Sequence, residues 1–170
     1  RIKYIQETLK NDLSNTKILD VGCGGGIVSE GIAKIGAIVT GIDFVKANIE
    51  VAKKHSKKNN LKISYIVKDF EKDKINNKFD AIIIFEVLEH LDNWEKFLIN
   101  IRSNLKKNGV LMISTINRNL ISKFFALDIA ENFLKWIPKK THNYYKFIKP
   151  EELEFVLSKN NFKKIKFKGL

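Results

Sequence analysis

The sequence predicts an α/β fold in which helices cover a mostly parallel, doubly wound sheet. Short apolar runs alternate along the chain with stretches of helical periodicity. One run, residues 79–85, is apolar almost throughout, as expected of a strand that is buried on both faces. Parallel strands need helical crossovers of one hand, so the alternation predicts a doubly wound sheet. At 170 residues, the chain is long enough for a single domain with a sizeable core.

Each element has a local signal. The expected strands are apolar and rich in β-branched residues, and they cover residues 17–21, 38–42, 63–67, 79–85, 109–115 and 162–167. The expected helices have apolar residues at intervals of three and four, and they cover residues 2–13, 27–35, 47–58 and 94–105. Gly36 is a natural stop for the second helix, and Pro150 opens a further helix after a long interruption.

The composition indicates in which cellular compartment the protein works. The single cysteine, Cys23, cannot form an internal disulfide, which is typical of a reducing compartment. No stretch reaches the roughly 18 uninterrupted apolar residues of a spanning helix, and no secretory signal opens the sequence. We therefore expect a cytoplasmic protein that is at most peripheral, on the inner face of the cytoplasmic membrane. The sequence starts at Arg1 without a methionine, which suggests part of a longer protein.

The formal net charge of +12 raises the question of nucleic-acid binding. Only three of the 31 basic residues are arginines, the type best suited to phosphates and base edges. Lysine, asparagine and isoleucine are abundant throughout, as in proteins from AT-rich genomes. We therefore expect no nucleic-acid partner, and an RNA-binding module is the alternative from a different functional class.

A glycine-rich turn connects the first expected strand to the next helix. The run Asp-Val-Gly-Cys-Gly-Gly-Gly starts at Asp20 and contains Gly22 and Gly24. Glycines let a ligand approach the backbone, and the helix offers its N-terminus. The dinucleotide fingerprint would need glycine where Ile27 stands, and no Gly-Lys-Ser/Thr of a P-loop follows. The pattern acid-x-G-x-G-x-G fits the Rossmann-like class I methyltransferases that use S-adenosylmethionine.

Asp43 closes the second expected strand, 21 residues beyond Gly22. A carboxylate there can accept hydrogen bonds from both hydroxyls of a ribose. Taken alone, each glycine could serve a tight turn and Asp43 a helix cap. The combination of strand, glycine turn, helix, strand and acid favours a cofactor site.

Missing motifs exclude other methyl transfers. Methylation of amino groups in nucleic acids uses an Asn/Asp-Pro-Pro-aromatic loop, but the only prolines are Pro138 and Pro150. Carbon methylation of cytosine needs a cysteine beside the substrate, whereas Cys23 lies in the glycine turn and is expected to have a packing role. Methyl transfer to oxygen, to a small-molecule nitrogen or to carbon remains.

The chain resembles the ubiquinone biosynthesis O-methyltransferases over nearly its whole length. The stretches that carry the resemblance are residues 20–26, 40–43, 86–90, 114–119, 138–142 and 146–153. The resemblance implies O-methylation of catechol-type, polyprenylated intermediates, with S-adenosylmethionine as donor. Members of this family begin before Arg1 and continue past Leu170 through a final antiparallel strand, which we therefore expect to be missing here.

The resemblance carries the family's cofactor positions onto Arg1, Gly22, Asp43 and Phe85, and Phe85 would line the apolar surface of the cofactor. It also makes other ubiquinone biosynthesis proteins candidate partners. Within the same enzyme class, the alternative is a methyltransferase that acts on another small metabolite.

Glu86, Glu89 and His90 follow the fourth expected strand at positions i, i+3 and i+4, which places them together if a helical turn begins there. Two carboxylates and an imidazole can hold a divalent cation, Mg²⁺ or Zn²⁺, that would favour the phenolate of a bound catechol. The resemblance supports metal binding by these residues. The alternatives are His90 as a general base without metal, and glutamates that only complement a helix dipole.

Residues 118–146 interrupt the alternation and are expected to form a helical lid or a membrane-facing insertion. Apolar residues recur there at helical spacing, at positions 121, 125, 129, 133 and 137, with five cations around them. We expect residues 118–140 to bind anionic lipid and gate the catechol pocket, or to pack on the sheet as a lid. His142 is a second candidate for a catalytic base, or a loop histidine on the surface.

Overall fold

The computed structural model describes residues 1–9, 12–115 and 147–169, which form two compact units. The first unit comprises Arg1–Phe85 and Asn100–Ile113. The second comprises Glu86–Ile99 and the described part of Ser114–Leu170. The expected insertion, residues 118–146, lies outside the described residues.

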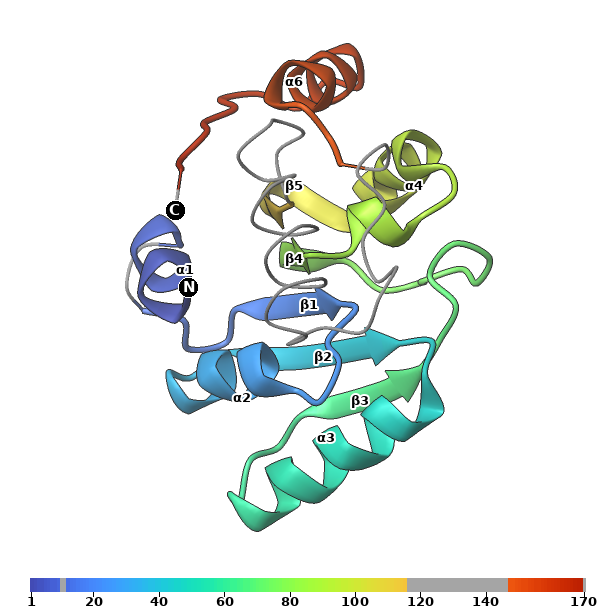
Figure 1. The fold of residues 1–170 in the computed structure, drawn as a ribbon. Coiled ribbons are helices and arrows are strands. Elements are labelled where there is room, and N and C mark those ends of the chain that lie inside the picture. Colours follow the sequence, from blue (N-terminus) through green and yellow to red (C-terminus); the bar gives the residue numbers. More distant parts are fainter. Residues whose placement is uncertain (10–11, 116–146, 170) are drawn as a thin grey trace, which may run out of the picture. The chain divides into compact units, whose positions relative to one another are not determined.

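The first unit contains a five-stranded sheet with the order β3-β2-β1-β4-β5 (Figure 1). Its strands are β1 (Lys17–Val21), β2 (Ile38–Asp43), β3 (Ser64–Val67), β4 (Phe79–Phe85) and β5 (Leu105–Ser114). β1 pairs in parallel with both β2 and β4, and β2 pairs in parallel with β3. The predicted α/β fold with a mostly parallel, doubly wound sheet is therefore confirmed.

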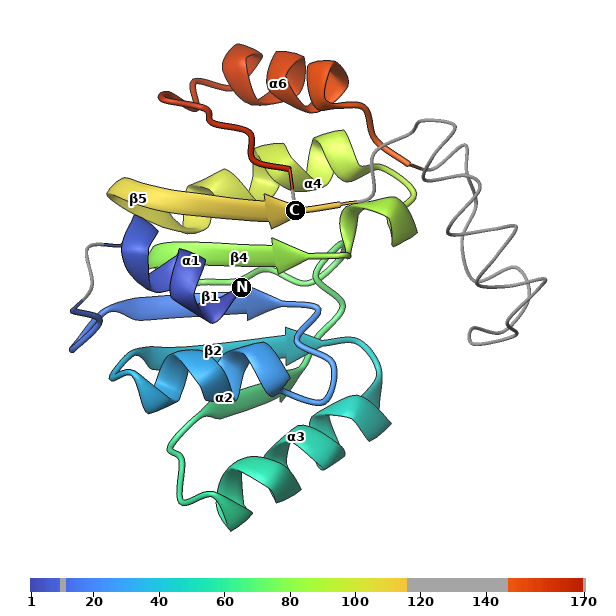
Figure 2. The same ribbon diagram turned by 60° about the vertical axis from the view of Figure 1, so that its left-hand side comes forward.

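The order of the strands reverses beside β1. From β1 the chain proceeds outward through β2 to β3, and it then returns to the other side of β1 with β4. Figure 2 shows the carboxyl ends of β1, β2 and β4 at one edge of the sheet. In open α/β sheets, ligands bind at this edge where the strand order reverses. A ligand site is therefore expected beyond Val21 and Phe85.

Three helices belong to the first unit: α1 (Ile2–Thr8), α2 (Ile27–Lys34) and α3 (Lys46–Lys58). The expected first helix, residues 2–13, is too long: α1 ends at Thr8, and Asp12 lies in an irregular segment, where its side chain accepts a hydrogen bond from the Ser14 N–H. α1 approaches α2 closely at Gly31, where a Cβ atom would lie 2.6 Å from Cδ1 of Ile2.

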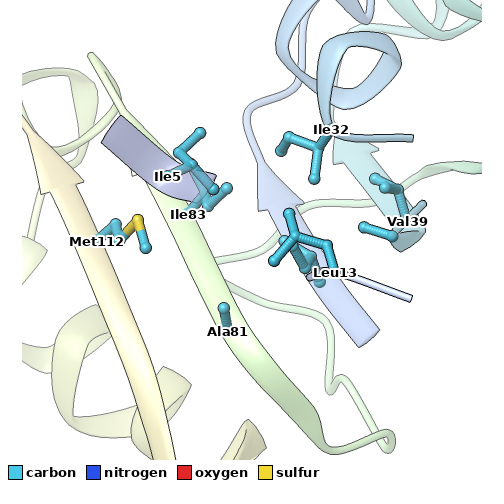
Figure 3. Close-up of a cluster of buried hydrophobic side chains, with 9 residues drawn as sticks. Ile5, Leu13, Ile32, Val39, Ala81, Ile83 and Met112 are labelled. Atoms are coloured by element: carbon cyan, nitrogen blue, oxygen red, sulfur yellow. The ribbon is translucent and has the colours of Figure 1, made fainter. Parts of the chain in front are cut away.

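One core cluster joins these helices to the sheet (Figure 3). Its buried members are Ile5, Leu13, Ile18, Ile32, Ala37, Val39, Ala81, Ile83 and Met112. They come from α1, α2 and four of the strands, together with the segments before β1 and before β2. Burial of these aliphatic side chains fixes the sheet that carries the glycine turn at its carboxyl edge.

The fifth strand and the helix before it differ from expectation. α4 (Trp94–Ile101) ends four residues early and is followed by a 3₁₀ turn, η2 (Arg102–Asn104). The buried Asn104 side chain explains this end, because its amide donates to the backbone carbonyls of Ile75 and Asn77. β5 can consequently begin at Leu105, four residues before the expected start.

The second unit contains η1 (Leu88–His90), the first six residues of α4, and α6 (Pro150–Lys159). α6 opens at Pro150 as predicted, and the Glu152 carboxylate accepts a hydrogen bond from the Lys149 N–H at its start. The strand expected over residues 162–167 is wrong: this segment is irregular, and the left-handed φ of 58° at Lys164 interrupts any extended run. Among the described helices, none combines the length and apolar character needed to cross a membrane.

Candidate functional site

The glycine turn after β1 adopts a conformation that requires glycine. Gly22, Gly24 and Gly26 have φ values of 69°, 52° and 86°, in the left-handed region. The N–H groups of Gly22 and Cys23 both donate to the carbonyl of Ile42, at 2.8 and 3.0 Å. The turn is therefore fixed to the end of β2. A Cβ at Gly24 would meet no atom within 4 Å, so the turn leaves open space on that side.

Asp43 lies beside this turn, as predicted from the sequence. Its Oδ2 accepts the Gly24 N–H at 2.9 Å, and its Oδ1 accepts the Val45 N–H at 2.8 Å and the Asn48 amide at 3.4 Å. A carboxylate has about four lone-pair sites, so one acceptor site is left after these three bonds. The structure thus brings Gly22, Gly24 and Asp43 together.

Asp20 is buried under the turn. Its Oδ2 accepts a 2.6 Å hydrogen bond from the Ser29 hydroxyl of α2. Burial raises the pKa of Asp20 to about 6, the Ser29 bond opposes this shift, and the charge of Asp43 adds to it. The Asp20 side chain therefore connects β1 to α2 through this hydrogen bond.

Cys23 behaves as the sequence predicts of a packing residue. Its side chain is buried with Ile49, Ala52 and Tyr65 in a small cluster of its own. Burial raises the pKa of the Cys23 thiol, and the nearby carboxylates Asp20 and Asp43 raise it further. The thiol stays protonated at neutral pH and is a poor nucleophile.

Arg1 and Phe85 come from distant parts of the sequence and meet in the structure. The Arg1 guanidinium carbon lies 5.6 Å from the centroid of the Phe85 ring, which is a cation–π geometry. Phe85 ends β4 at the carboxyl edge of the sheet. Two of the four residues that the resemblance assigned to the cofactor thus contact each other in the first unit.

Sequence reasoning missed two exposed apolar residues at this edge. Phe44 directly follows Asp43, is 64% exposed and makes an edge-to-face contact with Phe70 at 6.2 Å between ring centroids. Ile27 directly follows the glycine turn and is 86% exposed. The sequence did contain a signal for both residues, because each is apolar and stands directly next to a residue or turn that was assigned to a ligand. Exposed apolar groups mark binding surfaces.

In the second unit, Glu86 and Glu89 form a pair of neighbouring carboxyl groups. Glu86 accepts a 2.7 Å hydrogen bond from the Ser114 hydroxyl, and Glu89 accepts one of 3.2 Å from the Thr115 hydroxyl. Glu89 is buried, and its Oε1 has no hydrogen-bond partner among the described residues. Burial raises the pKa of Glu89 to about 7, and the adjacent Glu86 contributes to the same shift.

The described residues do not assemble the expected metal site of Glu86, Glu89 and His90. Glu86 has a left-handed φ of 55° and precedes η1, so the i, i+3 and i+4 spacing of a helix does not apply. His90 is exposed, whereas Glu89 is buried. Within the ranges that the structure describes, no three His, Cys, Asp or Glu residues are arranged to hold a metal ion. His142, the second predicted base, lies outside these ranges.

Comparison with known proteins gives one consistent result. The family model described as "Methyltransferase domain" matches residues 2–166. A ubiquinone biosynthesis O-methyltransferase of Rickettsia typhi is 43% identical over all of this chain and 70% of its own length. One of Pelagibacter ubique is 45% identical over all of this chain and 75% of its own length.

A solved structure adds a bound ligand. The plantazolicin methyltransferase BpumL in complex with SAH has 25% sequence identity to this chain and a TM-score of 0.69. The match covers 94% of this chain and 60% of BpumL. A fold of this kind therefore holds S-adenosylhomocysteine, the product left when S-adenosylmethionine has given up its methyl group.

Proposed function

This chain belongs to the ubiquinone biosynthesis O-methyltransferase family, and we propose that its substrate is a catechol-type oxygen of a polyprenylated intermediate in ubiquinone synthesis. The enzyme class is a methyltransferase that depends on S-adenosylmethionine. The finer proposal depends on the two relatives named above, which share more than 40% of their residues with the whole chain. An activity on another small metabolite is the alternative.

The residues of the first unit fit S-adenosylmethionine. The open side of Gly24 lets an adenosyl group reach the backbone, and the free acceptor site of Asp43 suits a ribose hydroxyl. Phe44 offers an exposed aromatic face next to Asp43 for the purine ring. The Arg1 guanidinium, held at the Phe85 ring, suits the carboxylate of the methionyl part. When bound, the cofactor supplies a methyl group on a positively charged sulfur.

The chain must also accept the proton of the reacting phenol, whose pKa is about 10. Among the described residues, Glu89 is a candidate acceptor, because a carboxyl group with a pKa of about 7 is partly ionised at neutral pH. His90 is a second candidate, since an exposed imidazole can accept a proton, and His142 stays a prediction from the sequence. A divalent cation also stays a prediction from the sequence.

The observation that carries this proposal is the buried carboxylate of Asp43 beside a glycine turn that leaves open space. Two measurements test it: calorimetric titration with S-adenosylhomocysteine, and methyl transfer to a prenylated catechol in detergent. We expect binding of the product and transfer to the catechol. Binding without transfer to any catechol would favour the alternative substrate, and salt-sensitive RNA binding without cofactor affinity would contradict the enzyme.

The same transfer assay decides the roles of the second unit. Loss of activity after exhaustive chelation, with recovery on addition of Mg²⁺ or Zn²⁺, would support the cation. Full activity in excess chelator would leave proton transfer to Glu89, His90 or His142. Three variants then separate these residues: Glu89→Gln, His90→Ala and His142→Ala. Only substitution of the true proton acceptor should lower kcat strongly without weakening affinity for the cofactor.

We propose further that the enzyme works at the inner face of the cytoplasmic membrane. A polyprenyl tail partitions into the bilayer, so an enzyme that acts on such a substrate has to meet it at the membrane surface. The lipid contact is proposed for residues 118–140, from their apolar stripe and five flanking cations in the sequence.

A further inference from the structure

Tyr65 packs against the glycine turn from the neighbouring strand. It lies in β3, where it is the direct parallel partner of Gly41 in β2, and its side chain is 4% exposed. Two residues beyond Gly41, β2 ends at Asp43, and the Lys68 N–H after β3 donates to the Asp43 carbonyl at 2.9 Å. β3 therefore supports both the turn and the carboxylate beside it.

The Tyr65 ring fills space that two glycines leave empty. A Cβ at Gly26 would lie 2.3 Å from Oη and 2.9 Å from Cζ of Tyr65. A Cβ at Gly41 would lie 2.7 and 2.8 Å from Cδ1 and Cε1 of the same ring. Real Cβ atoms do not come this close to another atom, so neither position tolerates a side chain while the ring is in place. The Tyr65 ring thus packs directly against both Gly26 and Gly41.

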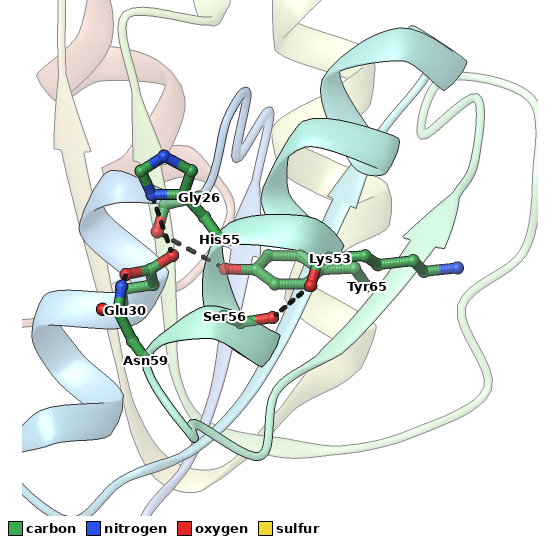
Figure 4. A network of polar contacts seen from close by, with 7 residues as sticks. All are labelled: Gly26, Glu30, Lys53, His55, Ser56, Asn59 and Tyr65. Atoms are coloured by element: carbon green, nitrogen blue, oxygen red, sulfur yellow. Dashed lines mark hydrogen bonds and ion pairs between the residues drawn. The ribbon is translucent and has the colours of Figure 1, made fainter.

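The Tyr65 hydroxyl also reaches the backbone of the turn (Figure 4). It donates to the carbonyl of Gly26 at 3.4 Å, and the same carbonyl accepts the Glu30 N–H of α2 at 2.8 Å. Burial raises the pKa of Tyr65, so the hydroxyl remains a donor at every physiological pH. The last carbonyl of the turn is therefore held by α2 on one side and by β3 on the other.

A second contact keeps the surrounding helices in place. The Glu30 carboxylate of α2 accepts a 2.8 Å hydrogen bond from the Asn59 amide at the end of α3. His55 of α3 lies 3.8 Å from the other carboxylate oxygen. Figure 4 shows His55 and Asn59 beside Glu30. α3 in turn brings Ala52 to within 3.0 Å of a Cβ at Gly26. The tyrosine ring is thus confined between β2, α3 and the turn.

We infer that Tyr65 is a positioning residue for the cofactor turn, acting through the Gly26 carbonyl and the packing at Gly26 and Gly41. The inference deepens the proposed function and rests on it, since the turn is assigned to S-adenosylmethionine. Tyr65 does not need to touch the cofactor. Its contribution is to hold the turn in the left-handed conformation that leaves Gly24 open.

The first test measures affinity for S-adenosylhomocysteine in folded variants by calorimetry. Tyr65→Phe removes one hydrogen bond and should weaken binding about threefold with little loss of stability. Tyr65→Val also removes the ring and should weaken binding at least about tenfold. In turnover, the KM for S-adenosylmethionine should rise while kcat at saturating cofactor changes little. The control Met112→Ala lies in the separate core cluster and should lower stability without changing affinity.

The second test is a double-mutant cycle with Gly41→Ala. Alone, this change should weaken binding, because its methyl group collides with the Tyr65 ring. In the Tyr65→Val background the collision with the ring is gone and only the tight contact with the Cys23 sulfur, at 3.0 Å, is left, so Gly41→Ala should have a clearly smaller further effect. Additive losses in the cycle, or folded Tyr65 variants with wild-type affinity, would overturn the inference.

A third readout separates failure of this inference from failure of the proposed function. Hydrogen exchange of residues 22–26 should become faster in Tyr65→Val and stay unchanged in Met112→Ala, whether or not a cofactor is present. A wild-type chain that does not bind S-adenosylhomocysteine would contradict the proposed function. Unchanged exchange in Tyr65→Val would contradict the positioning role independently.

Discussion

Asp20 is a buried carboxyl group in β1. Its side chain is almost completely buried, and burial raises its pKa to about 6, with one hydrogen bond from Ser29 as partial compensation. A raised carboxyl pKa means that the folded state binds the proton more tightly than the unfolded state. Between about pH 4 and pH 6, this group therefore makes the protein less stable as the pH rises. Above pH 6 the full cost is present.

We predict that Asp20→Asn removes this pH dependence. The stability of the variant relative to wild type should increase as the pH rises from 4 to 6.5, by on the order of 2 kcal/mol. Urea unfolding at a series of pH values measures this difference. Glu154→Gln, which neutralises an exposed carboxylate in α6, should run parallel to wild type. A constant difference between wild type and Asp20→Asn would mean that folding does not raise the pKa of Asp20.

We predict that Asp43→Ala weakens binding of S-adenosylhomocysteine by about 2–3 kcal/mol, because a charge-assisted hydrogen bond to the ribose is lost. The substitution also frees the N–H groups of Gly24 and Val45, so part of the loss comes from the turn itself. Asp43→Asn keeps one acceptor oxygen and should lose less. Calorimetry on both variants measures the affinities, and unchanged affinity in Asp43→Ala would place the ribose elsewhere.

The sequence predicted those site residues that a local pattern marks. Gly22, Gly24 and Asp43 stand at strand ends in a recognisable spacing, and the structure brings them together. Tyr65 carried no such signal, since a tyrosine in a strand is common, and its role depends on the parallel register with Gly41. The meeting of Arg1 with the Phe85 ring is a tertiary contact that no periodicity reports.

At the scale of elements, strand identity was predictable and element ends were less so. β1 and β4 have the predicted bounds, because a short and mostly apolar segment defines each of them. The end of α4 depends on Asn104, whose side chain reaches carbonyls almost 30 residues away in the sequence. The strand expected over residues 162–167 does not form. Its apolar residues alone do not supply a neighbouring strand with which it could pair.

The contact between α1 and α2 gives a prediction at this scale. In Gly31→Ala, α2 gains up to about 1 kcal/mol of helix propensity, while the new methyl group collides with Ile2. We therefore expect little change in the melting temperature but faster hydrogen exchange in α1. Because α1 follows Arg1, affinity for S-adenosylhomocysteine should also fall.

The double variant Ile2→Ala, Gly31→Ala removes the colliding side chain and is the control. Exchange in α1 should then return toward the rate of Ile2→Ala alone. Fast exchange of α1 that is independent of residue 31 would show that Gly31 does not determine this packing. If affinity for S-adenosylhomocysteine falls while exchange in α1 stays slow, the effect on Arg1 does not depend on the helix that follows it.

At the scale of the whole molecule, the order of strands explains why a short sequence pattern could locate the site. The reversal beside β1 places the glycine turn and the end of β4 at one edge of the sheet. The alternation of strands and helices predicts a class of folds in which such a reversal occurs. It does not predict the actual order of the strands, which depends on tertiary structure. The formal net charge of +12 is a property of the entire chain and attracts any polyanion.

We predict that this positive charge helps the protein to bind anionic membranes. In vesicle sedimentation, binding should increase with the fraction of anionic lipid and decrease with salt, since each cation near the surface contributes about 1 kcal/mol. Replacing Phe125, Phe133 and Trp136 together with serine should lower vesicle binding and leave affinity for S-adenosylhomocysteine unchanged. Phe155→Ser, at an exposed aromatic of α6, is the matched control and should bind vesicles like wild type. If the triple variant unfolds or loses the cofactor, these aromatics belong to a core, and the proposal that residues 118–140 bind lipid is wrong.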